Sequence, residues 1–221
     1  MKPAIAANGL SQRFGPRQAL RSLNLELEAG ERLAVLGDNG AGKTTLLRLL
    51  ATISRPAAGS LQLFGLDAIR QRSALRPRIG YLAHQPGLYP ALTALENLQF
   101  FAVLHGLPRS RAAEALDELD LGGAAQRPAG QLSRGMQQRL AIARCLLHDP
   151  ELVVLDEPDA SLDSAGRSVL GRLLRGRTVV MASHDLGFAR EICDRSLRLR
   201  DGRPLGDEFA LTVLSRDSSP C

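Results

Sequence analysis

The sequence predicts an α/β fold, with a mainly parallel sheet that is covered by helices on both faces. Short apolar runs typical of buried strands alternate with stretches in which apolar residues recur at helical spacing. A glycine-rich loop, Gly37–Thr44, lies directly between one such run and one such stretch. With 221 residues, of which 44% are hydrophobic, the chain can bury the core of a single domain or of a domain with a small subdomain.

The predicted strands are taken in chain order. Leu23–Glu28 alternates apolar and polar residues, which is the period of a strand with one buried face. Gly30 ends this strand, and Arg32–Leu36 is the next, more deeply buried one. Further apolar runs predict strands at residues 61–64, 79–82, 152–155, 178–182 and 196–199.

The predicted helices lie between most of these strands, at residues 44–53, 93–104, 109–119, 133–147 and 165–174. The stretch from about 90 to 148 contains consecutive helical patterns and no convincing strand, so we expect a helical subdomain inserted into the α/β core. We expect one domain over residues 1–214. The polar end, residues 215–221, is expected to be a flexible tail.

Composition excludes several classes of protein. The formal charge is +5, but basic residues are scattered among acidic ones and aromatic residues make up only 4%, so no direct nucleic-acid binding is expected. A basic face could instead meet anionic lipid headgroups beside a membrane partner. The cysteines, Cys145, Cys193 and Cys221, have no metal-binding spacing and are expected to be reduced thiols of a cytosolic protein. No stretch approaches the length of a membrane span, so the chain is expected to be soluble by itself.

The glycine-rich loop matches the phosphate-binding pattern G-x-x-x-x-G-K-[ST]. Its glycines allow backbone N–H groups to point at phosphates, Lys43 supplies a cation, and Thr44 offers a hydroxyl to Mg²⁺. Of the 28 lysine and arginine residues, only Lys2 and Lys43 are lysines. The loop thus contains a lysine in a chain that otherwise uses arginine, and a compact ammonium suits phosphates better than a planar guanidinium. The matching residues are Gly37, Asp38, Asn39, Gly40, Ala41, Gly42, Lys43 and Thr44.

Two adjacent carboxylates end a predicted strand. Buried parallel strands deliver their carboxyl ends to the ligand crevice, so Asp156 is a candidate for the Mg²⁺ hydration shell and Glu157 for polarising an attacking water. The simpler interpretation, an acidic turn after a strand, loses weight beside a phosphate-binding loop in the same chain.

Three further features carry less weight individually. Ser133 is placed to cap the helix 133–147, whose N-terminus would present free N–H groups to an anion, although ordinary capped helices look the same. His184 follows the strand 178–182, and Gln85 lies just beyond the strand 79–82. Each could be structural, because a lone histidine or amide has little diagnostic weight.

In their joint order these motifs resemble the nucleotide-binding domain of ATP-binding cassette (ABC) proteins over nearly the whole chain. The resemblance implies a P-loop NTPase core with an antiparallel β subdomain and an inserted helical subdomain. It also implies the family's roles for matching positions: Walker A at Gly37–Thr45 with Thr45 included, the Q-loop glutamine at Gln85, an LSGGQ-like segment at Leu132–Met136, the Walker B aspartate and catalytic glutamate at Asp156 and Glu157, the D-loop at Ala160–Asp163, the switch histidine at His184, and an adenine-stacking aromatic at Phe14.

The resemblance further implies the cofactors and partners. ATP and Mg²⁺ are expected, with Thr44, Gln85 and Asp156 around the metal, Glu157 as base, and Lys43 and His184 on the phosphates. A second ABC subunit, in a homodimer, is expected to supply Ser133 and Gly135 in trans. An integral membrane permease is the other expected partner, which would place the chain peripherally at the cytoplasmic face of the cell membrane.

The chain departs from the family pattern in places, and the subfamily stays open. Arg134 and Met136 replace the glycine and glutamine of LSGGQ, and the interval from Asp163 to His184 is short. The segments 84–87, 92–98 and 132–136 resemble those of the cytochrome c maturation haem exporter. The alternatives are a two-component multidrug or ion exporter and a non-transport ABC ATPase acting on ribosomes or DNA. Phe14 could equally be a core residue.

Overall fold

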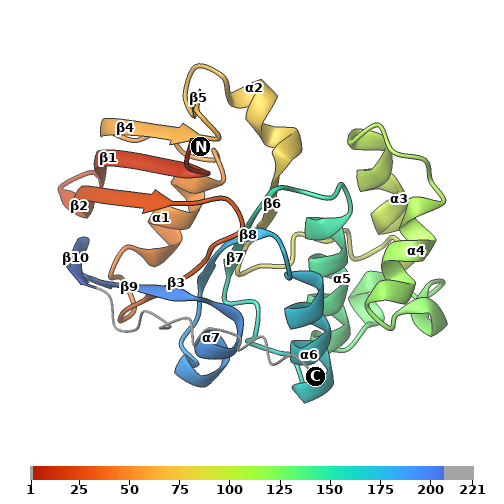
Figure 1. Ribbon diagram of the computed structural model, residues 1–221. Helices are drawn as coiled ribbons and strands as arrows, with labels where there is room; N and C mark the ends of the chain where they lie inside the picture. The colour runs from red at the N-terminus through yellow and green to blue at the C-terminus, as the bar shows by residue number, and fades with distance from the viewer. Residues whose placement is uncertain (1, 207–221) are drawn as a thin grey trace, which may run out of the picture.

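The structure is a computed structural model that describes residues 2–206. Its central sheet has six strands in the order β10-β9-β3-β8-β7-β6, and all neighbours are parallel except β9 and β10 (Figure 1). The mainly parallel sheet is thereby confirmed, whereas the predicted tail lies outside the described residues. The strands are β3 Arg32–Leu36, β6 Ile79–Leu82, β7 Leu152–Asp156, β8 Thr178–Ala182, β9 Arg195–Arg200 and β10 Arg203–Gly206.

A second, antiparallel sheet has the order β2-β1-β4-β5. Its strands are β1 Ile5–Phe14, β2 Arg17–Leu27, β4 Ala58–Leu63 and β5 Leu66–Asp67. The sequence predicted parts of β2 and β4 but missed β1, because its Ala, Asn and Gly residues have low strand propensity. The long pairing of β1 with β2 and β4 compensates for that weakness.

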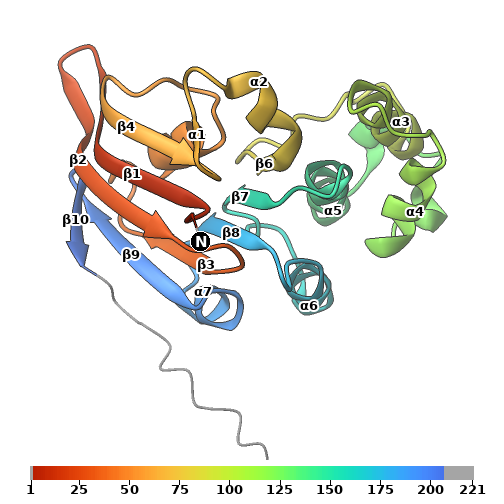
Figure 2. The same ribbon diagram turned by 45° about the horizontal axis from the view of Figure 1, so that its top comes forward.

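The helices are α1 Lys43–Leu50, α2 Arg72–Leu75, α3 Ala94–Leu104, α4 Arg111–Glu118, α5 Arg134–Leu146, α6 Ser164–Leu173 and α7 Leu186–Ile192. Figure 2 shows α1 between the two sheets and α5, α6 and α7 beyond the opposite face of the central sheet. The sequence did not predict α2 or α7, which are only one to two turns long.

The two faces of the central sheet bury separate hydrophobic clusters. Along β3, Leu33 and Val35 pack with α1 and the antiparallel sheet, whereas Ala34 and Leu36 pack with the helices of the other face. Side chains of a strand alternate between faces, so a fully apolar strand is what a sheet covered on both sides requires. On β7, Leu152 to Leu155 alternate between the two clusters in the same way. The strand then ends with Asp156, which lies at the carboxyl edge of the sheet.

The helices α3, α4 and α5 lie together at one side of the molecule, away from the antiparallel sheet (Figure 1). Thr93 begins α3 with a capping box in which its hydroxyl accepts the N–H of Glu96 and the Glu96 carboxylate accepts the N–H of Thr93. Asn97, fully buried, exchanges hydrogen bonds with the backbone of Tyr89, through both its amide nitrogen and its oxygen. These contacts fix the loop that leads from β6 into α3.

Arg144, near the end of α5, joins this loop to the helices. Its Nη1 donates to the carbonyl oxygen of Gly87 at 3.0 Å, and its guanidinium lies 5.1 Å from the centroid of the Phe101 ring on α3. Burial lowers the pKa of Arg144. One side chain therefore connects α5, α3 and the loop after β6.

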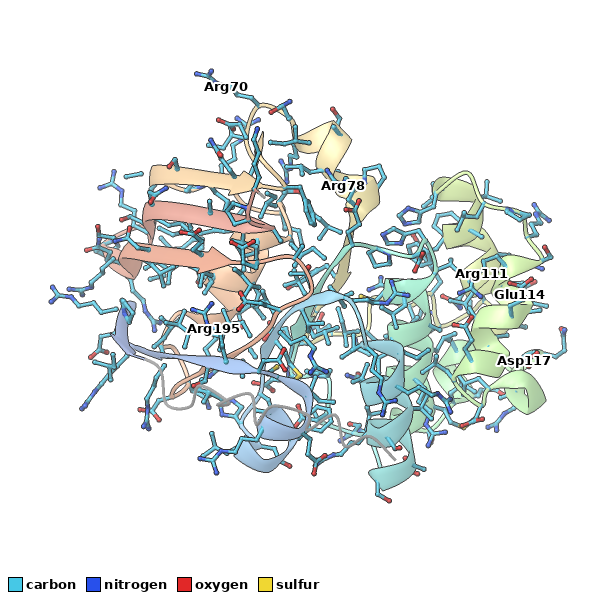
Figure 3. The ribbon with its side chains drawn as sticks, in the orientation of Figure 1. Arg70, Arg78, Arg111, Glu114, Asp117 and Arg195 are labelled. Atoms are coloured by element: carbon cyan, nitrogen blue, oxygen red, sulfur yellow. The ribbon has the colours of Figure 1, made fainter. Side chains whose placement is uncertain are left out.

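The charged side chains are spread over the surface and several are paired. Figure 3 shows the labelled Arg78, Arg111 and Arg195 on well-separated elements. Arg78 pairs with Glu151 at 2.6 Å, and Arg111 with Glu118 at 2.7 Å. Within residues 2–206, no helix combines the length and the apolar character that crossing a membrane demands.

Candidate functional site

The phosphate-binding loop connects β3 to α1 at the carboxyl edge of the central sheet. Gly37, Gly40 and Gly42 all have φ in the left-handed region, at 141°, 78° and 110°. A Cβ on Gly37 would collide with the carbonyl oxygen of Leu199, and one on Gly42 with that of Ala19. At Gly37 and Gly42, glycine is therefore required both by the positive φ and by the lack of space for a Cβ atom. The loop ends at the N-terminus of α1, where free N–H groups favour an anion.

Lys43 points back into this loop. Its side chain is buried, and Nζ donates to the carbonyl oxygens of Gly37 at 2.6 Å and of Asp38 at 3.2 Å. Burial lowers its pKa, and the nearby carboxylates of Glu157 and Asp156 act in the opposite direction. An ammonium held by neutral carbonyls can exchange them for phosphate oxygens, which bind it more strongly because they are charged.

A cavity of about 310 Å³ lies in front of the loop. Phe14, at the end of β1, lines it with 54% of its area exposed, so this ring is free to stack on a ligand and is not a core residue. Arg17, at the start of β2, also lines the cavity, and its Nη2 donates to the carbonyl oxygen of Gly40 at 3.1 Å. Arg17 was not predicted as a site residue, because nothing in the sequence distinguishes it from other arginines that follow a turn. The cavity residues are Phe14, Arg17, Ala19, Asn39, Gly40, Gly42, Lys43, Thr44, Thr45 and Glu157.

Asp156 ends β7 beside the loop. It is 2% exposed, the Thr44 hydroxyl hydrogen-bonds to its carboxylate, and Oδ2 is buried without a partner among the described residues. Burial raises its pKa, and the charge of Glu157 adds to this effect. A buried carboxylate oxygen with no donor beside a threonine hydroxyl fits Mg²⁺, a cation that takes oxygen ligands and keeps several waters. No three His, Cys, Asp or Glu side chains gather as a metal site in residues 2–206, so phosphates and water would complete the coordination.

Glu157 follows with its backbone in the left-handed region, at φ 54°, and its N–H donates to the carbonyl oxygen of Ala182 at 2.9 Å. Its carboxylate lies between two histidines. Oε1 is 2.9 Å from Nε2 of His184, and Oε2 is 3.2 Å from Nδ1 of His84. The structure thus brings His184 to Glu157, a contact that the sequence did not predict, and adds His84, to which no role was given.

Gln85 lies in the loop immediately after His84 and is exposed. Its side chain makes no hydrogen bond with another described residue, so it is not part of the contacts that join Thr44, Asp156 and Glu157. The same loop continues to Gly87, which Arg144 holds.

Ser133 caps α5, where its Oγ accepts the N–H of Met136 at 3.3 Å. Gly135 lies in the first turn, close to the carbonyl oxygen of Ser161. Neither residue lines the cavity at the loop. The start of α5 is therefore a candidate anion site that is separate from the loop cavity of the same chain.

The segment that follows Glu157 is hydrogen-bonded to both α5 and the histidine loop. Gln138 of α5 donates to the carbonyl oxygen of Pro158 at 3.0 Å. Ser183 donates to Oδ2 of Asp159 at 3.0 Å, next to His184. Burial raises the pKa of Asp159. The two candidate anion sites, at the loop and at the start of α5, are thus linked within one chain.

The fold and this site define a P-loop nucleoside triphosphatase, in which a glycine-rich loop and its lysine line one cavity and a strand-end aspartate lies beside them, hydrogen-bonded to Thr44. The family model described as "ABC transporter" matches residues 20–160, and the chain belongs to this family. It is the ATPase subunit of an ABC transporter, with ATP as its substrate and Mg²⁺ as the usual cofactor.

Known relatives cover nearly the whole chain. The ABC transporter ATP-binding protein NatA of Bacillus subtilis is 34% identical and covers 90% of this chain and 86% of its own length. The lipoprotein-releasing system ATP-binding protein LolD of Bacteroides fragilis is 37% identical, over 90% of this chain and 98% of its own. The solved dimeric structure of a post-hydrolysis state of the ATP-binding cassette MJ0796, bound to ADP and Pi, has a TM-score of 0.84 and 30% identity, and covers 92% of this chain and 97% of its own.

Proposed function

We propose that the chain hydrolyses ATP with the groups that the motifs indicate. Lys43 and the loop N–H groups, including those of Asp38, Asn39 and Ala41, bind the phosphates, while Thr44, Asp156 and Gln85 hold Mg²⁺. The metal, when bound, neutralises charge that develops on the phosphate oxygens. Glu157 accepts a proton from the attacking water, and His184 turns to the γ-phosphate. The observation that carries this proposal is the Glu157 carboxylate beside the loop cavity, 2.9 Å from His184.

We also propose that two copies of the chain form the complete site. Ser133 and Gly135 lie outside the loop cavity of their own chain, and the free N–H groups at the start of α5 would bind the γ-phosphate on a partner's loop. The dimeric state of MJ0796 supports this arrangement. Phe14 stacks on adenine, and Thr45 completes the loop.

The described residues fit one domain within the proposed 1–214, with residues 90–148 as its inserted helical subdomain. The helix α3 and the loop before it carry the exposed apolar surface of this part: Tyr89, Phe100, Val103 and Leu104 are 47%, 40%, 55% and 65% exposed. Tyr89 and Phe100 lie edge to face with ring centroids 5.1 Å apart. We propose that this aromatic surface receives the membrane permease, which would hold the chain at the cytoplasmic face of the cell membrane.

A crosslinking experiment tests this surface. Photoreactive side chains placed at Phe100 and Val103 are expected to crosslink to the membrane subunit in membranes, because both side chains are exposed on α3. Arg198, on β9, provides a control position in a different part of the fold. Crosslinks from position 198 alone would contradict the assignment. Leu92 and Leu95, which are half-buried, serve the packing of this region more than its outer surface.

At the finer level, we propose haem export for cytochrome c biogenesis as the transport function. The support is the sequence of three segments: 84–87 in the loop after β6, 92–98 at the start of α3, and 132–136 at the start of α5. The relatives are diverse, since their names include phosphonate import and daunorubicin resistance. A multidrug or ion exporter of the two-component type is therefore the principal alternative.

The deciding experiment purifies the chain with its membrane partner and records the absorption spectrum of the complex. We expect a multispanning permease and a haem absorption band that decreases on ATP turnover. A complex without haem whose ATPase activity rises with lipophilic cations would favour the multidrug alternative. Cosedimentation with ribosomes, without any membrane protein, would place the chain among the non-transport ATPases.

A further inference from the structure

His84 contacts the carboxylate that we propose as the catalytic base, and the pairing of β6 with β7 places it there. The two strands are parallel neighbours in which Leu82 lies opposite Leu155. Two residues further along each chain are His84 and Glu157. Both side chains therefore follow the ends of neighbouring strands and lie together at the carboxyl edge of the sheet.

The geometry occupies both oxygens of the carboxylate. Nδ1 of His84 is 3.2 Å from Oε2, and Nε2 of His184 is 2.9 Å from Oε1. A carboxylate only accepts hydrogen bonds, so either ring nitrogen can bind its oxygen only as an N–H donor. The two donors come from opposite sides, since β6 and β8 flank β7 in the sheet.

The two histidines have different roles in the proposed hydrolysis step. When His184 turns to the γ-phosphate, Oε1 becomes free to accept the proton of the attacking water. Oε2 still has its donor in His84. A base that keeps one oxygen bound cannot rotate away from the water, and a displacement of about 1 Å in a reacting group costs up to 100-fold in rate.

We propose that His84 is a positioning residue for hydrolysis, which holds Oε2 of Glu157 and so directs Oε1 to the attacking water. The proposal rests on the assignment of Glu157 as the base. In this scheme His84 acts on ATP only through Glu157, which lines the loop cavity, whereas His84 does not. Its effect is therefore on the chemical step and not on ATP binding.

The test uses the purified full chain with His84→Ala and His84→Asn. The histidine side chain is 68% exposed, so neither change removes core packing. For His84→Ala we expect kcat to fall about 10-fold with KM for ATP unchanged within about 2-fold, because one oriented hydrogen bond to the base is lost. The amide nitrogen of asparagine lies near the position of Nδ1, so His84→Asn should recover kcat to within about 3-fold of wild type. His105→Asn is the matched control and should leave both constants unchanged, because His105 follows α3, stacks on His148 and contacts neither Glu157 nor the loop cavity.

Two results would overturn the role of His84. One is a kcat of His84→Ala equal to or above the wild-type value. The other is a loss of activity that asparagine fails to restore or that appears in KM, since both would indicate a structural role.

The variant Glu157→Gln distinguishes this proposal from the assignment of the base. If glutamine at 157 abolishes turnover while His84→Ala does not lower it, the base stands and the positioning role fails; if Glu157→Gln turns over normally, the base assignment itself fails. In the Glu157→Gln background, His84→Ala should cause no further loss.

Discussion

Glu157→Gln is expected to lower the ATP turnover of the chain by about 100- to 10,000-fold, the range that a general base contributes, while ATP still binds. Glutamine has nearly the shape of glutamate, so it preserves the left-handed turn at this position and the hydrogen bond of its N–H to Ala182. It loses the negative charge and the ability to take a proton. The variant should therefore hold ATP without releasing phosphate.

Two measurements establish this result. Phosphate release gives the loss of turnover, and a fluorescent ATP analogue gives the affinity, which should stay within about 3-fold of wild type because Glu157 acts in the chemical step. Glu28→Gln, a neutralised glutamate in the exposed turn after β2, is the matched control and should retain full activity. Wild-type phosphate release from Glu157→Gln would contradict the assignment of the base.

Lys43→Ala is expected to weaken both ATP binding and turnover, in contrast to Glu157→Gln. A charge-assisted hydrogen bond to phosphate contributes about 1.5–3 kcal/mol, so ATP affinity should fall by roughly 10- to 100-fold and turnover by still more. The buried ammonium also bonds the carbonyl oxygens of Gly37 and Asp38, so its removal frees the loop at the same time. Equilibrium dialysis with labelled ATP measures the affinity.

Lys2 provides a control for the loss of a lysine, because it is the only other lysine of the chain and lies near Gly65, at the edge of the structure. Lys2→Ala should bind and hydrolyse ATP normally. Lys43→Arg should behave like Lys43→Ala, since a planar guanidinium does not fit the space that a compact ammonium occupies beside the Gly37 carbonyl. Normal ATP binding by both Lys43 variants would show that the loop does not bind phosphate as proposed.

The sequence predicted the central sheet better than the rest of the fold, for a physical reason. The strands at 32–36, 79–82 and 178–182 have the bounds that were expected, because a strand covered on both faces must be apolar throughout and its ends are abrupt. β1 was missed because its position depends on long-range pairing with β2 and β4. α7 was missed because Asp185 caps a helix of only seven residues.

The same division holds for the site. The loop and the strand-end acids could be predicted, since each lies within one continuous segment. The contacts of Glu157 with His84 and His184 could not, because they join three strands whose order in the sheet is not written in any local pattern. The position of Arg17 beside Gly40 likewise depends on how the antiparallel sheet packs against the loop.

Arg144 directly connects α3, the helix that carries most of the aromatic surface, with the loop that contains Gln85. Its guanidinium contacts Phe101 on one side and Gly87 on the other, two residues from Gln85. A displacement of α3 can therefore reach the loop through this one side chain, without passing along the thirteen residues between Gly87 and Phe101 in the polypeptide. The rigidity of the Arg144 side chain therefore determines how much of a displacement at α3 is transmitted to the loop after β6.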